Sequence, residues 1–386
     1  MNVRNVLVVA AAGMLVVAAA PPASAGAAPI AGDQLYILNG GDDSGAGANV
    51  ARFGIGADGR VSPEGTVEAD PGRGLVFTPP LGVAGVQFAY AAGDLDAVNA
   101  IDRFRVGPGG ALTPIGTTPS PEPFDIAIDP HGPTVFVSNF HGDDEGMLSA
   151  FHVQPNGDLR LINAVPSGDV HPKGLAVTPD GRFLYVAHGT PRSPNPRPTI
   201  VTGFAIGAGG RLSDTPVTKA LIGASGHRAA ITPDGRFLYV TMQEAGDTGD
   251  VFGYRIGPSG ELTAVSEKPF ETGVWTEGIA IAPDGRRLYV DSLGVVGSPD
   301  ADGDVRGFAI GADGTLTEVA RAGAGLDPND LAVGLDGKHV YVGDGTGNTV
   351  LVFEAGARGG LKLLQTVPSQ GVGPTYHGVT VQPRRH

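Results

Sequence analysis

The sequence predicts an all-β protein, a single seven-bladed β-propeller with four-stranded blades, on the basis of three recurring markers. The first is a Pro-Asp-Gly turn followed by a short apolar strand, clearest at residues 178–186, 232–240 and 282–290, with weaker copies centred on Tyr36, Ala89, Phe136 and Tyr341. The second is an aromatic residue in an alternating run, at Phe53, Phe104, Phe151, Phe204, Tyr254, Phe308 and Phe353. The third is a Gly-x-Leu or Gly-x-Val segment that begins at Gly59, Gly110, Gly157, Gly210, Gly260, Gly314 and Gly359. Each marker occurs seven times, and self-similarity at a period of roughly 20–50 residues is the signature of a repeat architecture.

Each repeat unit is expected to form four strands. In the unit that contains residues 178–186, residues 174–178 are an apolar run suited to a strand buried near an axis. The Pro-Asp-Gly turn leads into a second strand at 183–186, because Pro presets φ and Gly tolerates positive φ. A third strand is expected at 201–206 and a fourth after Gly210. No sustained helical period interrupts the pattern, and radial repetition of such sheets, which protects their edges, produces a propeller.

The register of the repeat also predicts how the ring closes. The repeats begin in the middle of a unit, with residues 34–38 as a second strand, and end at residues 376–383, which form a lone first strand. The two ends of the repeat region are therefore expected to complete one blade together.

The domain organisation predicted is a signal peptide at 1–25, a short linker at 26–32 and the propeller at 33–384. Residues 6–20 carry no polar group, and Ala23-Ser24-Ala25 offers the small residues that signal peptidases accept. A membrane anchor is the alternative, but this apolar run is shorter than the ~20 residues that span a bilayer. We therefore expect a secreted, extracytoplasmic protein that has no membrane attachment after cleavage. The absence of Cys excludes disulfides and thiolate chemistry.

The formal net charge of −14 bears on the partners of the protein. An acidic surface repels phosphate backbones and anionic lipid head groups, and no cluster of Lys or Arg offsets it. We therefore expect no nucleic-acid partner. The partner that we expect is a small molecule or a lactone, and we expect the protein to be a monomer.

A set of polar residues is predicted to face the axis of the propeller. The residue six positions before each Pro-Asp-Gly proline enters the innermost strand; in one unit Leu335 replaces the proline, and Asp336 sets the register. In the seven units this residue is Arg73, Phe124, Lys173, His227, Glu277, Asn329 and His377. Converging polar groups in a concavity are the default hypothesis for a ligand site, and a solvated ring around a water-filled channel is the alternative.

These axial residues include the groups that a hydrolytic mechanism requires. Such a mechanism needs an acid or base that titrates near neutrality and a cation beside the developing oxyanion. His227 and His377 suit the first role, with Glu277 as an alternative. The second role suits Lys173, Arg73 and Arg228.

Two other segments are interpreted as structural. The acidic segment 300–304 lacks the Gly and distal Glu of an EF-hand, so its carboxylates are interpreted as solvated turn residues rather than calcium ligands. The segment 343–347 is rich in Gly but joins two strands instead of opening a helix, which excludes a phosphate loop. We expect neither a metal site nor a cofactor.

Repeats of the form Pro-Asp-Gly-Arg-x-x-Tyr-Val resemble those of the YVTN-repeat propellers and of the seven-bladed lactonase propellers. That family includes 6-phosphogluconolactonases and 3-carboxy-cis,cis-muconate lactonizing enzymes. The resemblance covers residues 33–384, and Asn139-Phe140-His141-Gly142 is similar to the family's Asn-Tyr-x-x-Gly element. It implies the propeller fold and a lactone hydrolase, a carboxylic ester hydrolase of carbohydrate metabolism.

The resemblance also implies positions for a catalytic group. In the family this group is a His in a His-Pro-His-type segment, an Arg in a Gly-Pro-Arg-His segment and a Glu after a Tyr-x-x-Asn strand. The matching segments of this sequence are His171-Pro172-Lys173, Gly226-His227-Arg228 and Met242-Gln243-Glu244. Lys173 therefore stands at the place of the inner His, His227 at that of the Arg, and Gln243 at that of the Glu.

Two functions remain open at this point. The first is a lactonase-like enzyme that acts on a sugar-type lactone, and the second is a non-catalytic scaffold that binds a small ligand, a cell-wall component or a protein. The candidate catalytic residues are Lys173, His227, Arg228 and Glu277. The candidate ligand-binding residues are Arg73, His171, Gln243, Glu244, Asn329 and His377.

Overall fold

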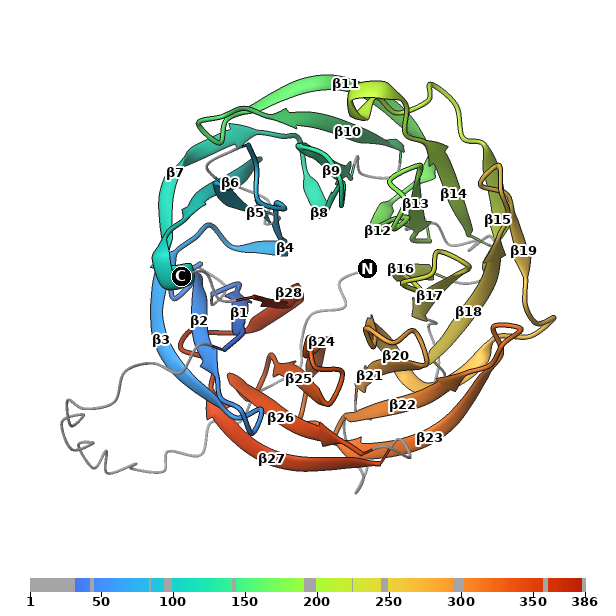
Figure 1. The fold of residues 1–386 in the computed structure, drawn as a ribbon. Coiled ribbons are helices and arrows are strands. Elements are labelled where there is room, and N and C mark those ends of the chain that lie inside the picture. Colours follow the sequence, from blue (N-terminus) through green and yellow to red (C-terminus); the bar gives the residue numbers. More distant parts are fainter. Residues whose placement is uncertain are drawn as a thin grey trace, which may run out of the picture. The chain divides into compact units, whose positions relative to one another are not determined.

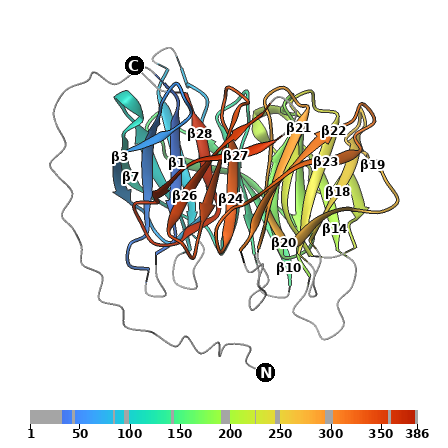
Figure 2. The same ribbon diagram turned by 90° about the horizontal axis from the view of Figure 1, so that it is seen from below.

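The computed structural model of the chain describes residues 32–41, 45–82, 85–93, 99–140, 144–190, 199–223, 225–243, 249–293, 302–356 and 360–383. These residues form seven blades of four antiparallel strands, arranged as a ring in Figure 1 and seen from the side in Figure 2. Within the described residues, helical structure is limited to two short 3₁₀ turns at Pro108–Gly110 and Ala208–Gly210. The predicted all-β propeller is confirmed.

Each blade contributes one strand to each of four concentric layers. The innermost strands are β4 (Gly72–Phe77), β8 (Pro123–Ile128), β12 (Pro172–Val177), β16 (Ser225–Ile231), β20 (Phe270–Ile281), β24 (Pro328–Val333) and β28 (Pro374–Gln382). The second strands are β1 (Gln34–Asn39), β5 (Gln87–Gly93), β9 (Thr134–Asn139), β13 (Phe183–His188), β17 (Phe237–Gln243), β21 (Arg287–Leu293) and β25 (His339–Asp344). The third strands are β2 (Asn49–Ile55), β6 (Ala100–Val106), β10 (Glu145–Val153), β14 (Ile200–Ala205), β18 (Gly249–Ile256), β22 (Asp304–Ile310) and β26 (Thr349–Ala355). The outermost strands are β3 (Val61–Glu68), β7 (Leu112–Pro119), β11 (Leu159–Val170), β15 (Thr218–Leu221), β19 (Leu262–Ala264), β23 (Leu316–Gly323) and β27 (Leu361–Pro368).

The ring closes as the repeat register predicted. Strand β28, from the end of the propeller, pairs with β1, from its beginning, and β2 and β3 complete that blade. Each innermost strand contacts the innermost strands of the two neighbouring blades, and β28 lies between β24 and β4. The shared closing blade is visible in Figure 1, where the red β28 lies beside the blue β1.

Two blades depart from the regular pattern in their outer strands. The strand expected directly after Gly210 is delayed, since Leu212 forms only an isolated bridge with Ile206 and β15 begins at Thr218. Pro216 lies in the intervening segment and has no N–H to donate to a ladder. In the next blade β19 is short, and the first residues of β20 continue its pairing with β18 before the chain crosses to the axis.

The core consists of apolar layers between neighbouring blades, and two of the sequence markers meet there. Buried Tyr side chains of the second strands donate their hydroxyl to a glycine carbonyl of the Gly-x-Leu turn in the following blade. The pairs are Tyr36 with Gly110, Tyr90 with Gly157, Tyr185 with Gly260, Tyr239 with Gly314 and Tyr341 with Gly59, at 2.7–3.1 Å. The last pair links the seventh blade of the chain to the first. In these five pairs the first and the third marker each supply one half of a bond that joins two blades.

Replacement of one such tyrosine tests this bond. Tyr185→Phe keeps the buried ring but leaves the Gly260 carbonyl without its donor, so we expect the free energy of unfolding to fall by about 1–3 kcal/mol. Chemical denaturation of the wild type and the variant measures the change. Lys362→Ala, on an exposed position of β27, is the control. Equal stability of Tyr185→Phe and the wild type would contradict this role of the hydroxyl.

Candidate functional site

The predicted axial residues occupy equivalent places in the ring. In every innermost strand the pairing register with the second strand shifts at or beside the axial residue. Such a bulge inserts an unpaired residue and re-aims its side chain. The propeller therefore interrupts its ladder at the same point in all seven blades.

The axial residues also lie at one end of the ring. A Cβ atom on Gly174, which follows Lys173, would lie 2.7 Å from Arg228 Cα, and one on Gly278, which follows Glu277, would lie 3.0 Å from Asp330 Cα. Equivalent residues of neighbouring innermost strands are therefore side by side, and these strands run in the same direction. We call the end where they begin the start side; the Pro-Asp-Gly turns lie at the other end, the turn side.

Phe124 is the centre of the contacts among axial residues. The guanidinium carbon of Arg73 lies 4.6 Å from the centroid of its ring, and Lys173 Nζ lies 5.9 Å from it. The His227 ring meets the Phe124 ring edge-on at a centroid distance of 6.2 Å. Four consecutive blades thus bring two cations and an imidazole around one aromatic ring, an arrangement that cation–π attraction favours.

Burial and neighbouring charges alter the titration of two axial residues. Burial lowers the pKa of Lys173 to about 8; the Arg73 charge acts in the same direction and Glu277 opposes it. Burial also raises the pKa of Glu277 well above its usual value, with further contributions from Asp291 and Asp327, while Lys173 and Arg73 oppose the shift. The structure therefore brings together an ammonium that titrates near neutrality and a carboxyl that retains its proton more readily than usual.

An aromatic stack extends from Phe124 toward His171. The Phe140 ring stacks on Phe124 at a centroid distance of 5.7 Å and on His171 at 4.3 Å. His171 is buried, and its Nδ1 lies 2.7 Å from the Thr190 carbonyl oxygen. The histidine expected from the family resemblance is thus held beside the axial residues by stacking and by a hydrogen bond.

Arg228 was expected to stabilise a developing oxyanion, but its guanidinium is engaged elsewhere. Its guanidinium forms a salt bridge with Asp330, a fully buried carboxylate two blades away. The second oxygen of Asp330 accepts a hydrogen bond from the Val379 backbone N–H at 2.8 Å. The Arg228–Asp330 ion pair and the hydrogen bond from Val379 therefore link β16, β24 and β28 directly beside the axial residues.

Of the remaining candidate ligand-binding residues, the structure describes the side chain of Asn329. Asn329 is buried, and its amide donates a hydrogen bond to the Pro374 carbonyl at 3.2 Å. The side chains of Gln243 and His377 and all of Glu244 lie outside the described residues.

Asp291 is a buried acid beside the site that the sequence analysis did not select. It lies on β21, where its Oδ1 accepts a hydrogen bond from the Gly278 backbone N–H at 2.7 Å. Its Oδ2 has no hydrogen-bond partner among the described residues. Burial and Asp330 raise its pKa to about 8, although the Gly278 N–H and Arg228 favour ionisation. The available signal was a carboxylate directly after Tyr-Val, a place where other units have Ser138 or Thr241.

The titration of Asp291 predicts a dependence of stability on pH. Its pKa in the folded state exceeds the usual 3.8, so its contribution to stability is complete below about pH 4 and is lost as the pH rises toward about 8. Asp291→Asn still accepts a hydrogen bond from the Gly278 N–H but cannot ionise. As the pH rises between these values, we expect its free energy of unfolding to fall less than that of the wild type. Each unit of pKa difference corresponds to about 1.4 kcal/mol.

Denaturation of both proteins at several pH values measures this difference. Asp284→Asn, at an exposed turn, is the matched control. If Asp291→Asn loses stability with rising pH as steeply as the wild type, Asp291 does not carry the effect.

The acidic segment 300–304 is described only in part, since Asp300 lies outside the described residues. The Asp304 carboxylate forms salt bridges with Arg306 at 3.0 Å and Arg321 at 2.6 Å. Among the described residues, no group of three His, Asp or Glu side chains is arranged to hold a metal ion.

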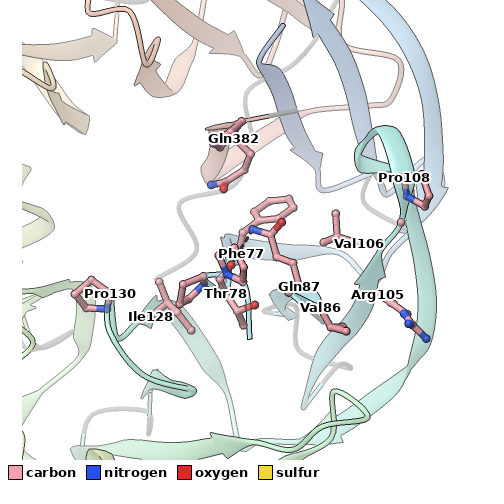
Figure 3. A pocket seen from close by; sticks show the side chains of 15 residues that line it. Phe77, Thr78, Val86, Gln87, Arg105, Val106, Pro108, Ile128, Pro130 and Gln382 are labelled. Carbon is pink, nitrogen blue, oxygen red and sulfur yellow. Dashed lines mark hydrogen bonds between the residues drawn. The ribbon is translucent and has the colours of Figure 1, made fainter. Parts of the chain in front are cut away.

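A cavity among the described residues lies away from the axial residues. It has a volume of about 780 Å³ and is lined by the ends of innermost strands, at Phe77, Ile128 and Gln382, as Figure 3 shows. It is therefore on the turn side, whereas Arg73 and Phe124 lie on the start side. Its lining is mostly apolar and rich in proline, and Arg105 is its one ionisable residue among those described. The groups that could supply acid–base chemistry gather around Phe124 instead.

Comparison with known proteins establishes the class. The family model of the seven-bladed β-propeller lactonases matches residues 46–192 and 201–376. The chain belongs to this family. No curated protein matches it.

Solved structures share the fold at low sequence identity. A periplasmic gluconolactonase of Pseudomonas aeruginosa is 21% identical with a TM-score of 0.68, over 90% of this chain and 99% of that one. A candidate 6-phosphogluconolactonase of Bacteroides fragilis is 18% identical with a TM-score of 0.67, over 92% and 99%. A functionally unknown protein of Desulfotomaculum acetoxidans is 14% identical with a TM-score of 0.68, over 91% and 98%. Identities this low support the fold, and the chemistry must be argued from the residues of this chain.

No helix within the described part of the chain is long and apolar enough to span a membrane.

Proposed function

We propose that this protein is an exported lactone hydrolase that acts as a monomer on a sugar-type lactone in a pocket on the start side of the axis. One observation carries the proposal: Arg73, Lys173 and His227 are gathered around Phe124. Membership of the lactonase propeller family supports the reaction class. The apolar run and small residues in 1–25 support export.

The proposed reaction adds water to the lactone carbonyl and breaks the ring C–O bond. The carbonyl oxygen gains negative charge as water attacks, and the Lys173 ammonium, assisted by Arg73, stabilises that charge. His227 accepts the proton of the attacking water. Glu277, which burial keeps protonated more readily, donates a proton to the ring oxygen as the bond breaks. The product is an open-chain hydroxy acid, and no cofactor enters the step.

A second candidate function, a binding scaffold, is favoured by the state of Arg228. The family resemblance places an Arg in this segment, yet the guanidinium of Arg228 forms a salt bridge with the buried Asp330. If Arg228 only stabilises the fold through this salt bridge, the protein could bind a ligand among the axial residues without hydrolysing it.

Hydrolysis of five- and six-membered sugar lactones by the purified protein distinguishes the two functions. Rates are corrected for spontaneous ring opening, which is measured without protein. A rate above this background supports the hydrolase. A rate equal to background, together with saturable binding of an unreactive sugar lactam, would replace it with the scaffold.

A further inference from the structure

Trp275 combines a large apolar side chain with exposure at the start side of the ring. It is the single Trp of the sequence and is 46% exposed. It lies on β20, two residues before the axial Glu277 and just after the segment that pairs with β18. The chain therefore carries an exposed indole at the point where β20 arrives at the axis.

The backbone holds Trp275 in a conformation that a bulky residue rarely adopts. Its φ of 46° lies in the left-handed region. Buried hydroxyls on both sides of it fix this conformation: Thr272 Oγ1 lies 2.6 Å from Thr276 Oγ1, and Ser292 Oγ donates to the Thr272 carbonyl at 2.6 Å. Conformations of this kind are strained and cluster at functional sites.

The same position in another blade indicates where the indole lies. His171 also stands two residues before an axial residue, Lys173, and its φ is 49°. Its ring reaches the axial residues through Phe140, which stacks on Phe124. Because the blades are related by rotation about the axis, the backbone of Trp275 has the corresponding place in its own blade. The difference is that His171 is 2% exposed and Trp275 is 46% exposed.

A second exposed apolar side chain precedes the innermost strand of the neighbouring blade. Leu326 is 54% exposed and stands three residues before the axial Asn329 in the neighbouring blade. One sector of the start side thus presents apolar surface, whereas the sector around Phe124 presents cations. Apolar surface beside convergent polar groups is the usual composition of a small-molecule site.

We propose that Trp275 is a positioning residue whose indole stacks against the C–H face of a sugar-type lactone and directs its carbonyl toward Lys173. The inference rests on the proposed hydrolytic function. Large rigid aromatics contribute contact area at low entropic cost, and the indole is presented on a strand rather than a loop. Stacking requires a flat ligand face, so a cyclic sugar lactone is favoured over an open-chain ester.

Because the protein has one Trp, emission excited at a wavelength that tyrosine does not absorb reports on this residue alone. We expect saturable change of the emission when the wild type is titrated with D-glucono-1,5-lactam, an unreactive analogue of the lactone. For hydrolysis of D-glucono-1,5-lactone, Trp275→Ala is expected to raise KM about 3- to 10-fold at nearly unchanged kcat. Trp275→Phe should restore most of the affinity. Leu335→Ala removes an apolar side chain that is 44% exposed on a turn-side loop, and it is the control.

The outcomes separate this inference from the proposed reaction. If the wild type hydrolyses the lactone while its emission does not respond and Trp275→Ala keeps its KM, the stacking role is wrong and the hydrolase stands. If the wild type does not hydrolyse the lactone but its emission saturates with the lactam, the stacking role stands and the function is binding.

Discussion

Removal of residues 374–386 is expected to abolish cooperative folding instead of lowering the stability by a modest amount. This deletion takes away β28, the innermost strand of the closing blade, which pairs with β1 and contacts both β24 and β4. Val379 and Val381 of β28 are buried with Leu35 and Ile37 of β1. In a ring each blade depends on both neighbours, so loss of one strand exposes two apolar faces at once.

Thermal and urea unfolding followed by far-ultraviolet circular dichroism measures this effect. The matched control is a chain that lacks only residues 384–386, which keeps β28 whole. It should unfold like the full-length protein. A chain without 374–386 that unfolds in one transition, with the same midpoint and denaturant dependence as the full-length protein, would show that the closing strand is dispensable.

The fold could be predicted from the sequence because residues of the repeat markers form the bonds that hold neighbouring blades together. The Tyr of one marker bonds to the Gly of another in the next blade, as Tyr185 does with Gly260. A tyrosine that both fills a strand position and forms a bond between blades recurs in five of the seven units. The delayed β15 was not predicted, because its position depends on Pro216 and on local pairing rather than on the repeat.

The site could be predicted only to the level of position. The repeat register located the axial residues, but it could not show that Phe124, the one apolar member, would be the residue around which Arg73 and Lys173 gather. Nor could it show that Arg228 reaches Asp330, which is 102 positions away in the sequence. Such contacts depend on how each bulge directs its side chain and on which blades become neighbours, and neither is encoded in local pattern.

Lys173→Ala is expected to lower kcat for lactone hydrolysis about 10²- to 10³-fold, by analogy with the loss of one oxyanion donor. The ammonium lies 5.9 Å from the centroid of the Phe124 ring, and no second lysine is present among the axial residues. His227→Ala is expected to cost about 10²- to 10⁴-fold through loss of the general base. Lys268→Ala, which removes the same side chain from an exposed outer position, should keep the full rate.

The pH dependence of the reaction identifies Lys173 more specifically than the loss of rate does. Its pKa is lowered to about 8, so the ammonium is present below that pH and is lost above it. The wild-type kcat/KM should therefore fall as the pH rises through about 8, after correction for spontaneous hydrolysis. Lys173→Arg keeps its charge across this range and should show no such fall, even if its rate is lower. An unchanged fall in Lys173→Arg would assign the titration to another group, and full activity in both Lys173→Ala and His227→Ala would place the reaction outside the axial residues.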